Sequence, residues 1–196
     1  MTAVEDEWLR LFVAIEIGDG VRRALSDVQS ELRKCGLGSV RWVRPEGIHL
    51  TLKFLGETPA GQVPAIKQAL ASAVVGVSPH RLALGELGAF GSKRSPRVLW
   101  VGLEGDTETL AGLQEQVDRA LETAGFPREP RPFSAHLTLA RVRPHEASGV
   151  AQVVSEVLSS VRVAQAALDV REVSLMRSQL GGGGAVYSRL DAFPLG

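Results

Sequence analysis

Cysteine is almost absent from this chain of 196 residues, in which Cys35 is the only one. A single cysteine excludes an internal disulfide and favours a reducing compartment, so we expect a cytoplasmic protein. The sequence also lacks an apolar run of about 18 residues, and its first residues are acidic, with neither a basic leader nor an apolar stretch. These absences predict a protein that is neither exported nor inserted in a membrane.

An excess of charge of one sign is also missing, because 22 Lys and Arg balance 22 Asp and Glu. A protein that binds long duplex nucleic acid is strongly basic, so any contact with nucleic acid is expected to be local. Hydrophobic content of 44% with 22% charged residues excludes a disordered chain. The length predicts a single domain over residues 1–196, built from two lobes that share a cleft. We expect it to act as a monomer.

Helical and strand patterns interrupt one another along the chain. Apolar residues at spacings of three and four predict four helices, over 21–32, 62–75, 110–121 and 150–161. Short apolar or alternating runs predict roughly eight strands, at 11–15, 40–43, 48–55, 81–87, 98–103, 133–142, one or two within 163–176, and 186–190. A mobile polar loop is expected at 88–96 and a flexible hairpin connection at 181–184. This mixture predicts an α+β fold.

The order strand, proline turn, strand, helix occurs over residues 40–75 and again, less cleanly, over 98–161. This repetition suggests that the two lobes are related.

The tetrapeptide His-Leu-Thr-Leu occurs twice, beginning at His49 and at His136, each time inside a predicted strand. Residues two apart on a strand share a face, so His49 lies beside Thr51 and His136 beside Thr138, while the leucines face the other way. If both strands line one cleft, one imidazole can take a proton while the other gives one. The threonine hydroxyls can donate to phosphate oxygens. The pattern therefore predicts displacement at phosphorus by acid–base catalysis.

A zinc site is the main alternative for paired histidines. Only His80 and His145 remain as further histidines, both beside proline in predicted loops, and Cys35 lies at the end of the first predicted helix, just before Gly36 closes it. No Gly-x-Ser-x-Gly elbow is present, and the glycine run at 181–184 lacks the lysine and Ser/Thr of a phosphate-binding loop. A lone histidine in a strand is more often an ordinary core or surface residue, but the repeated threonine offset favours a catalytic pair. We expect no metal and no cofactor.

Four segments in a fixed order carry a family resemblance: 40–45 (VRWVRP), 49–57 (HLTLKFLGE), 96–102 (PRVLWVG) and 136–141 (HLTLAR). They resemble the bacterial and archaeal RNA 2′,3′-cyclic phosphodiesterases, also called 2′-5′ RNA ligases, of the two-histidine phosphoesterase superfamily. The resemblance covers nearly the whole chain. It implies a two-lobed, pseudo-symmetric α+β fold whose antiparallel sheets line a central cleft, with helices outside. It also implies hydrolysis of a 2′,3′-cyclic phosphate at an RNA end to a 2′-phosphate.

The same resemblance implies roles for single residues. His49 is the general acid that protonates the leaving 3′ oxygen, and His136 is the base that activates water. Thr51 and Thr138 bind phosphate oxygens. Arg141 matches a family arginine at the phosphate, although strict alternation from His136 aims it away from the cleft, so a bulge or the end of the strand must redirect it.

Further candidates surround these residues. Lys53 lies on the cleft side by parity with His49 and is expected to assist at the phosphate.

One departure from the family pattern is Ala135, where proline is expected; the absence of proline loosens the start of the strand but removes no chemical group. Four aromatic residues are candidates for stacking on a base, with the first of them preferred: Phe54, Phe12, Trp42 and Tyr187.

Two other functions stay open at this point. One is an RNA-end binding or 2′-5′ ligation factor, which would not need both histidines to hold RNA. The other keeps the chemistry but takes a cyclic phosphate on a nucleotide or an ADP-ribose derivative.

Overall fold

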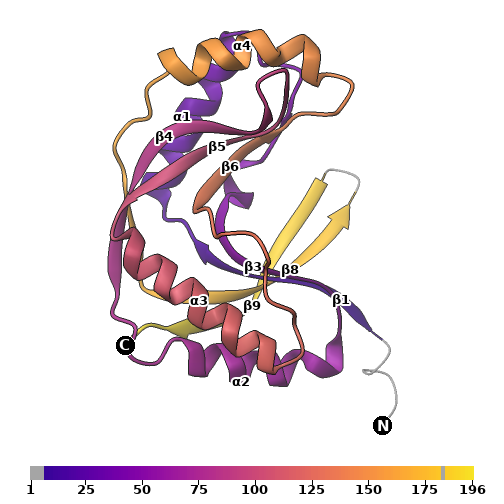
Figure 1. Cartoon of the computed structure of the whole chain (residues 1–196), viewed down its shortest axis with the longest axis vertical. Helices are drawn as coiled ribbons and strands as arrows, with labels where there is room; N and C mark the ends of the chain where they lie inside the picture. Colours follow the sequence, from indigo (N-terminus) through magenta and orange to yellow (C-terminus); the bar gives the residue numbers. More distant parts are fainter. Residues whose placement is uncertain (1–6, 182–183) are drawn as a thin grey trace.

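One antiparallel sheet carries the strands of the computed structural model, which describes residues 7–181 and 184–196 (Figure 1). The strands are β1 (Trp8–Glu16), β2 (Arg41–Trp42), β3 (His49–Pro59), β4 (His80–Ser92), β5 (Ser95–Gly105), β6 (His136–Arg141), β7 (Ala167–Val170), β8 (Glu172–Gly181) and β9 (Gly184–Pro194). The α-helices are α1 (Asp19–Lys34), α2 (Val63–Ala73), α3 (Thr107–Thr123) and α4 (Ala147–Ser160), with short 3-10 turns η1 (Pro45–Gly47) and η2 (Ala60–Gln62). The strand order is β7-β4-β5-β6-β3-β1-β8-β9, and β2 pairs with β6. The predicted α+β class is confirmed.

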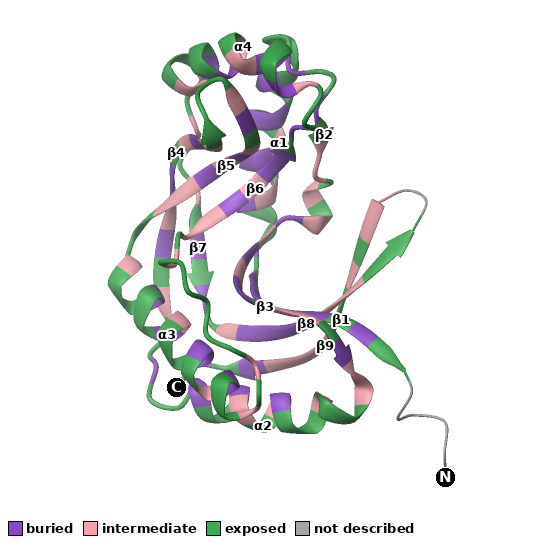
Figure 2. Ribbon diagram, turned by 45° about the vertical axis from the view of Figure 1, so that its right-hand side comes forward, coloured by how far each residue is buried: buried purple, intermediate pink, exposed green. Residues whose placement is uncertain are grey.

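All four predicted helices are present, because their periodic apolar residues have a sheet to pack against. Helix α1 shows this well: it buries Val21, Leu25, Val28 and Leu32, the residues whose spacing predicts it. Buried positions lie along the strands and on the inward sides of the helices, while the outward sides are exposed (Figure 2). No helix within the described ranges is both long enough and apolar enough to cross a bilayer.

The helices cover two parts of the sheet. Helices α1 and α4 lie over the part that contains β4, β5, β6 and β7, and α2 and α3 lie over the part that contains β1, β3, β8 and β9 (Figures 1 and 2). The order strand, helix, motif strand, helix occurs twice, as β1, α1, β3, α2 and as β5, α3, β6, α4. The two parts meet where β3 and β6 pair, through Leu50 and Leu137. This junction therefore lies one residue after each motif histidine.

The predicted loop at 88–96 is wrong. Strand β4 continues through Ser92 and pairs with β5 from Ser95 onward, so the two strands form a long hairpin. The glycines that suggested a loop instead allow close approach: a Cβ atom at Gly88 would lie 2.2 Å from the ring of Trp100. A glycine in a strand here makes room for an aromatic ring.

The segment 163–176 forms two strands, β7 and most of β8, which resolves the choice that the sequence leaves open. Strands β8 and β9 form a hairpin that projects beyond the rest of the sheet (Figure 1). Its last described pair is Gly181 with Gly184, so the predicted connection lies partly outside the described residues.

Candidate active site

The two motif histidines stand at the start of neighbouring antiparallel strands. Strands β3 and β6 pair through Leu50 and Leu137, the residues that follow the two histidines. Extending this antiparallel register by one residue in each direction sets His49 opposite Thr138 and Thr51 opposite His136. The four side chains therefore share one face of the sheet, here called the inner face, and all four are half-buried. The buried leucines between them point to the other face, which the helices cover. Two imidazoles from distant parts of the chain are thus brought together.

Each imidazole is oriented by a carbonyl two residues earlier. The Nδ1 atom of His49 lies 2.9 Å from the oxygen of Gly47, and that of His136 lies 2.7 Å from the oxygen of Ser134. A carbonyl oxygen accepts hydrogen bonds only, so Nδ1 carries the proton in both rings. Nε2 is left to take a proton when the ring is neutral and to donate one when it is charged.

Aromatic rings enclose His49. Phe12 stacks on it with ring centroids 4.7 Å apart, and Tyr187 meets it edge-on at 5.0 Å. Phe54 lies 6.3 Å from Phe12 on the same face and is 69% exposed. The imidazole thus lies in a largely apolar setting that opens toward Phe54.

Burial of the ring lowers the pKa of His49 below its ordinary value of 6.5. The hydrogen bond to Gly47 and the negative charge of Glu16 oppose this shift, and the positive charge of Arg141 adds to it. Glu16 is the cross-strand neighbour of His49 in β1 and was not identified from the sequence. In the free protein the neutral ring is favoured.

His136 has its own aromatic partners. Phe90 meets its ring edge-on at 4.8 Å, and Trp100 lies 6.3 Å away. Sequence reasoning missed both, since it placed Phe90 in a loop and used Trp100 only as part of a family segment. The alternation of apolar residues with glycine through β4 and β5 is the signal that could have found them.

Both motif strands contain a β-bulge at the same place. The register between β1 and β3 skips Leu52, and that between β5 and β6 skips Leu139. Each of these leucines is the fourth residue of its motif, and the six residues from each histidine show the same burial pattern. An extra residue shifts the alternation by one. Phe54 and Arg141 therefore return to the inner face, whereas Lys53 does not.

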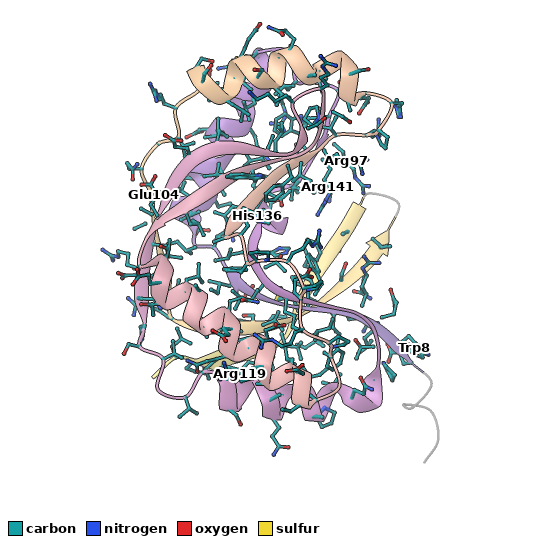
Figure 3. The ribbon with its side chains drawn as sticks, in the orientation of Figure 1. Trp8, Arg97, Glu104, Arg119, His136 and Arg141 are labelled. Atoms are coloured by element: carbon teal, nitrogen blue, oxygen red, sulfur yellow. The ribbon has the colours of Figure 1, made fainter. Side chains whose placement is uncertain are left out.

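The bulge in β6 directs Arg141 as its proposed role requires. Its side chain is exposed, and its charge acts on His49 of the other motif strand. Figure 3 shows Arg141 and Arg97 close together at the end of β6 farthest from His136. Arg41 pairs with Arg141 across β2 and β6 and so shares its face. Positive charge thus extends from the histidines along one side of the sheet.

The family model of LigT-like phosphoesterases matches the chain twice, over residues 15–100 and over residues 101–187. The chain belongs to this family. Each matched segment holds one His-x-Thr motif, so the family match follows the structural repeat.

Relatives of this LigT-like phosphoesterase span nearly its whole length. Proteins named RNA 2′,3′-cyclic phosphodiesterase from Methanothermobacter thermautotrophicus and Archaeoglobus fulgidus are 33% and 34% identical. The first match covers 95% of this chain and 99% of the relative, and the second covers 94% and 99%. A Thermus thermophilus structure superposes with a TM-score of 0.74 at 28% identity, covering 95% of this chain and 98% of the other. Escherichia coli LigT in complex with 3′-AMP gives 0.73 at 25% identity, covering 96% and 99%.

Lys53 is not on the inner face of this phosphoesterase, so that prediction is wrong. The bulge at Leu52 turns the Lys53 side chain to the helix-covered face of the sheet. There its ammonium group is buried, pairs with Asp118 of α3 and donates to the Pro127 carbonyl at 2.6 Å. Arg128 also contacts Asp118, at 3.3 Å. Lys53 therefore fastens β3 to α3 and to the segment that leads into β6.

Replacing Lys53 by methionine should destabilise the protein by about 3 kcal/mol, because Asp118 stays buried with only part of its compensation. Urea unfolding measures the change. Lys67→Met is the matched control, since its ion pair with Asp191 is partly exposed, and it should cost no more than about 1 kcal/mol. Equal losses in the two variants would contradict the anchoring role.

Two of the four candidate stacking residues, Trp42 and Phe12, already pack against other side chains of the protein. Trp42 pairs with Ala140, which is buried on the helix-covered face, and lies 4.5 Å from the guanidinium of Arg33 in α1. Phe12 is 3% exposed and its face is taken by His49. The prediction that these two rings stack on a base is therefore wrong, because packing partners take the place of a ligand.

No cluster of three or more His, Cys, Asp or Glu side chains suited to a metal lies within residues 7–181 and 184–196. The expectation of catalysis without a metal stays a prediction, to be tested with a chelator.

Proposed function

We propose that this phosphoesterase hydrolyses 2′,3′-cyclic phosphates at RNA ends to 2′-phosphates, without a metal and as a single bilobed monomer. The observation that carries this proposal is the pair of imidazoles on one face of the sheet, each with Nε2 left for the substrate. The relatives' names supply the substrate class, and the LigT complex with 3′-AMP is a structural neighbour that holds a nucleotide.

The reaction moves one proton at each histidine. Nε2 of His136 takes a proton from water as the water oxygen attacks phosphorus, and Nε2–H of His49 gives a proton to the 3′ oxygen as its bond to phosphorus breaks. Attack and departure lie roughly in line, which suits a base and an acid on opposite sides of one phosphate. The products are a 2′-phosphate and a 3′-hydroxyl. Arg141, Thr51 and Thr138 compensate the charge on the non-bridging oxygens.

The neighbours of the two histidines support this assignment of acid and base. Glu16 lies across the ladder from His49, whereas Gly102 lies across from His136. A carboxylate favours the charged imidazole, so Glu16 and the bound phosphate anion both oppose the effect of burial and favour a protonated His49 in the complex with substrate.

The pH dependence of kcat/KM tests the assignment. A general acid works only while protonated, so the rate should fall as pH rises through the pKa of His49 in the free enzyme, which lies below 6.5. In kcat the same limb should lie at higher pH, because the bound phosphate anion raises this pKa. A rate that instead rises through the His49 limb would assign His49 as the base. The His49 titration itself is followed independently by NMR.

Incubation with an oligonucleotide that ends in a 2′,3′-cyclic phosphate, in excess EDTA, tests the function directly. We expect full turnover in the chelator and a 2′-phosphate as the product isomer, identified by chromatography against both standards. Loss of turnover that added divalent cation restores would reject the metal-free mechanism, and a 3′-phosphate product would reject the assignment of the leaving oxygen.

The arginines beyond the histidines favour RNA over a mononucleotide. Arg41 and Arg141 share a face, and neither has an acidic partner among the ion pairs of the described residues. A backbone phosphate next to the cyclic end of an RNA would supply the negative charge that these two arginines lack. We therefore expect a higher kcat/KM for a cyclic-phosphate oligonucleotide than for the matching mononucleotide, with a difference that shrinks in Arg41→Gln. A ligation or end-binding factor would instead retain RNA binding and strand joining without its histidines.

A further inference from the structure

Helix α1 carries a polar residue on the side that faces the core. Gln29 is 1% exposed between apolar neighbours, where burying an amide costs free energy unless it is hydrogen-bonded. Its Nε2 atom donates to two backbone carbonyls, that of Leu139 at 3.0 Å and that of Val43 at 2.8 Å. The Leu139 oxygen also accepts from the backbone N–H of Val43 at 2.9 Å. The amide therefore joins β6 to the segment that runs from β2 through η1 to His49.

The carbonyl that Gln29 holds belongs to the extra residue of the β6 bulge. Without the bulge, alternation from His136 would place Ala140 on the inner face and turn Arg141 toward the helices. The bulge leaves Leu139 outside the ladder with β5, so partners for its backbone favour the bulged register over the regular one. The Leu139 carbonyl has two such partners, the N–H of Val43 and the Gln29 amide, and Gln29 is the one that comes from a helix.

The other half of the molecule repeats this arrangement. Gln114 of α3 donates to the carbonyl of Leu52, the extra residue of the β3 bulge, at 3.4 Å. In each case the first helix of one repeat supplies a glutamine to the motif strand of the other repeat. The Gln114 contact is the weaker of the two, because this side chain is half-buried and makes one long bond where Gln29 makes two. Its recurrence at the same carbonyl of the other motif nevertheless indicates that the contact belongs to the repeat.

We infer that Gln29 is a positioning residue of the active site, which holds the β6 bulge so that Arg141 projects toward the two histidines. Its second bond, to Val43, fixes the approach of the segment that carries His49. Gln114 has the corresponding effect on Phe54. The effect of Gln29 on the reaction rate rests on the proposed function, whereas its effect on the position of Arg141 does not.

Gln29→Met tests this inference, because methionine fills a similar volume and removes both donated hydrogen bonds. The charged groups that act on His49 are Glu16 and Arg141, and Tyr187 packs on its edge. Release of Arg141 should therefore raise the pKa of His49, followed by NMR titration of the imidazole C–H signals. Arg141→Gln should raise it as well, and the double variant should show no further rise. A purely structural glutamine would not produce this dependence.

Activity supplies a second measurement. We expect kcat/KM on the cyclic-phosphate oligonucleotide to fall about ten- to hundred-fold in Gln29→Met, because small displacements of a charge-stabilising group cost that much. The double variant with Arg141→Gln should be no slower than Arg141→Gln alone, within about twofold, if Gln29 acts through Arg141.

Val28→Ala is the matched control. It removes buried apolar atoms from the neighbouring position of α1 and leaves both carbonyl bonds in place. It should lower the melting temperature without moving the His49 titration. A Gln29→Met protein that is destabilised while its titration and kcat/KM stay at wild-type values would overturn the inference.

If Gln29→Met does not fold, Gln29→Asn replaces it, since its shorter amide cannot span both carbonyls. Failure of both variants to fold would assign Gln29 to the scaffold and reject the positioning role. The titration needs no turnover, so a wild-type protein that does not cleave the oligonucleotide would reject the proposed function and leave this result standing.

Discussion

Replacement of either His49 or His136 by alanine is expected to lower kcat on a cyclic-phosphate RNA by about 10²- to 10⁴-fold, because in the proposed mechanism each ring transfers a proton during the displacement. The double variant should be little slower than the worse single variant, since an acid and a base that act on one transition state do not contribute independently. Initial rates with a labelled oligonucleotide measure the loss. Thermal unfolding checks that each variant is folded.

Two further variants make this result specific. His49→Gln keeps a polar side chain between Phe12 and Tyr187 and should be as inactive as the alanine variant, which separates lost chemistry from lost packing. His145→Ala removes an exposed imidazole outside the site and should retain wild-type rates. More than about a tenth of wild-type turnover in His49→Ala or His136→Ala would contradict the acid–base pair, given the size of the effect expected for each.

Arg141→Gln is expected to reduce kcat/KM by about 10²- to 10³-fold, the usual loss when one donor to a developing oxyanion is removed. The same change removes a positive charge that lowers the pKa of His49, so that pKa should rise and the acidic form should persist to higher pH. The pH profile of kcat/KM should therefore move toward higher pH as its height falls.

Arg143→Gln is the control for Arg141→Gln. Arg143 lies two residues farther along the chain and is already paired with Glu146. Its replacement should change kcat/KM by less than about twofold, as expected for an exposed pair. Arg141→Lys should restore part of the rate, because it returns the charge without the planar fork. Equal losses in Arg141→Gln and Arg143→Gln would indicate general electrostatic attraction and not a contact at the phosphate.

The helices and the two motifs could be predicted from the sequence because their signals are local. An apolar residue every third or fourth position describes a helix face wherever the helix lies. The repeated His-x-Thr spacing likewise needs only the strand period of two to place each histidine with its threonine. Predictions failed where a contact from elsewhere in the chain decided the outcome. The segment 88–96 was taken for a loop because glycines such as Gly88 look like breakers when the Trp100 ring that covers this position is unknown.

Lys53 and Arg141 show most clearly where prediction from the sequence ends. By parity the first should face the substrate and the second should not, and the fold reverses both assignments through one extra residue in each strand. The sequence alone determined which side chains are available for chemistry. It also determined where the four helices lie and that each half of the chain carries one imidazole in a repeated motif. Only the tertiary structure decided that the two imidazoles lie on one face at the β3–β6 junction and that Arg141 returns to that face. The reason is that a bulge is stabilised by its partner strand and by amides such as Gln29, which approach from distant parts of the chain.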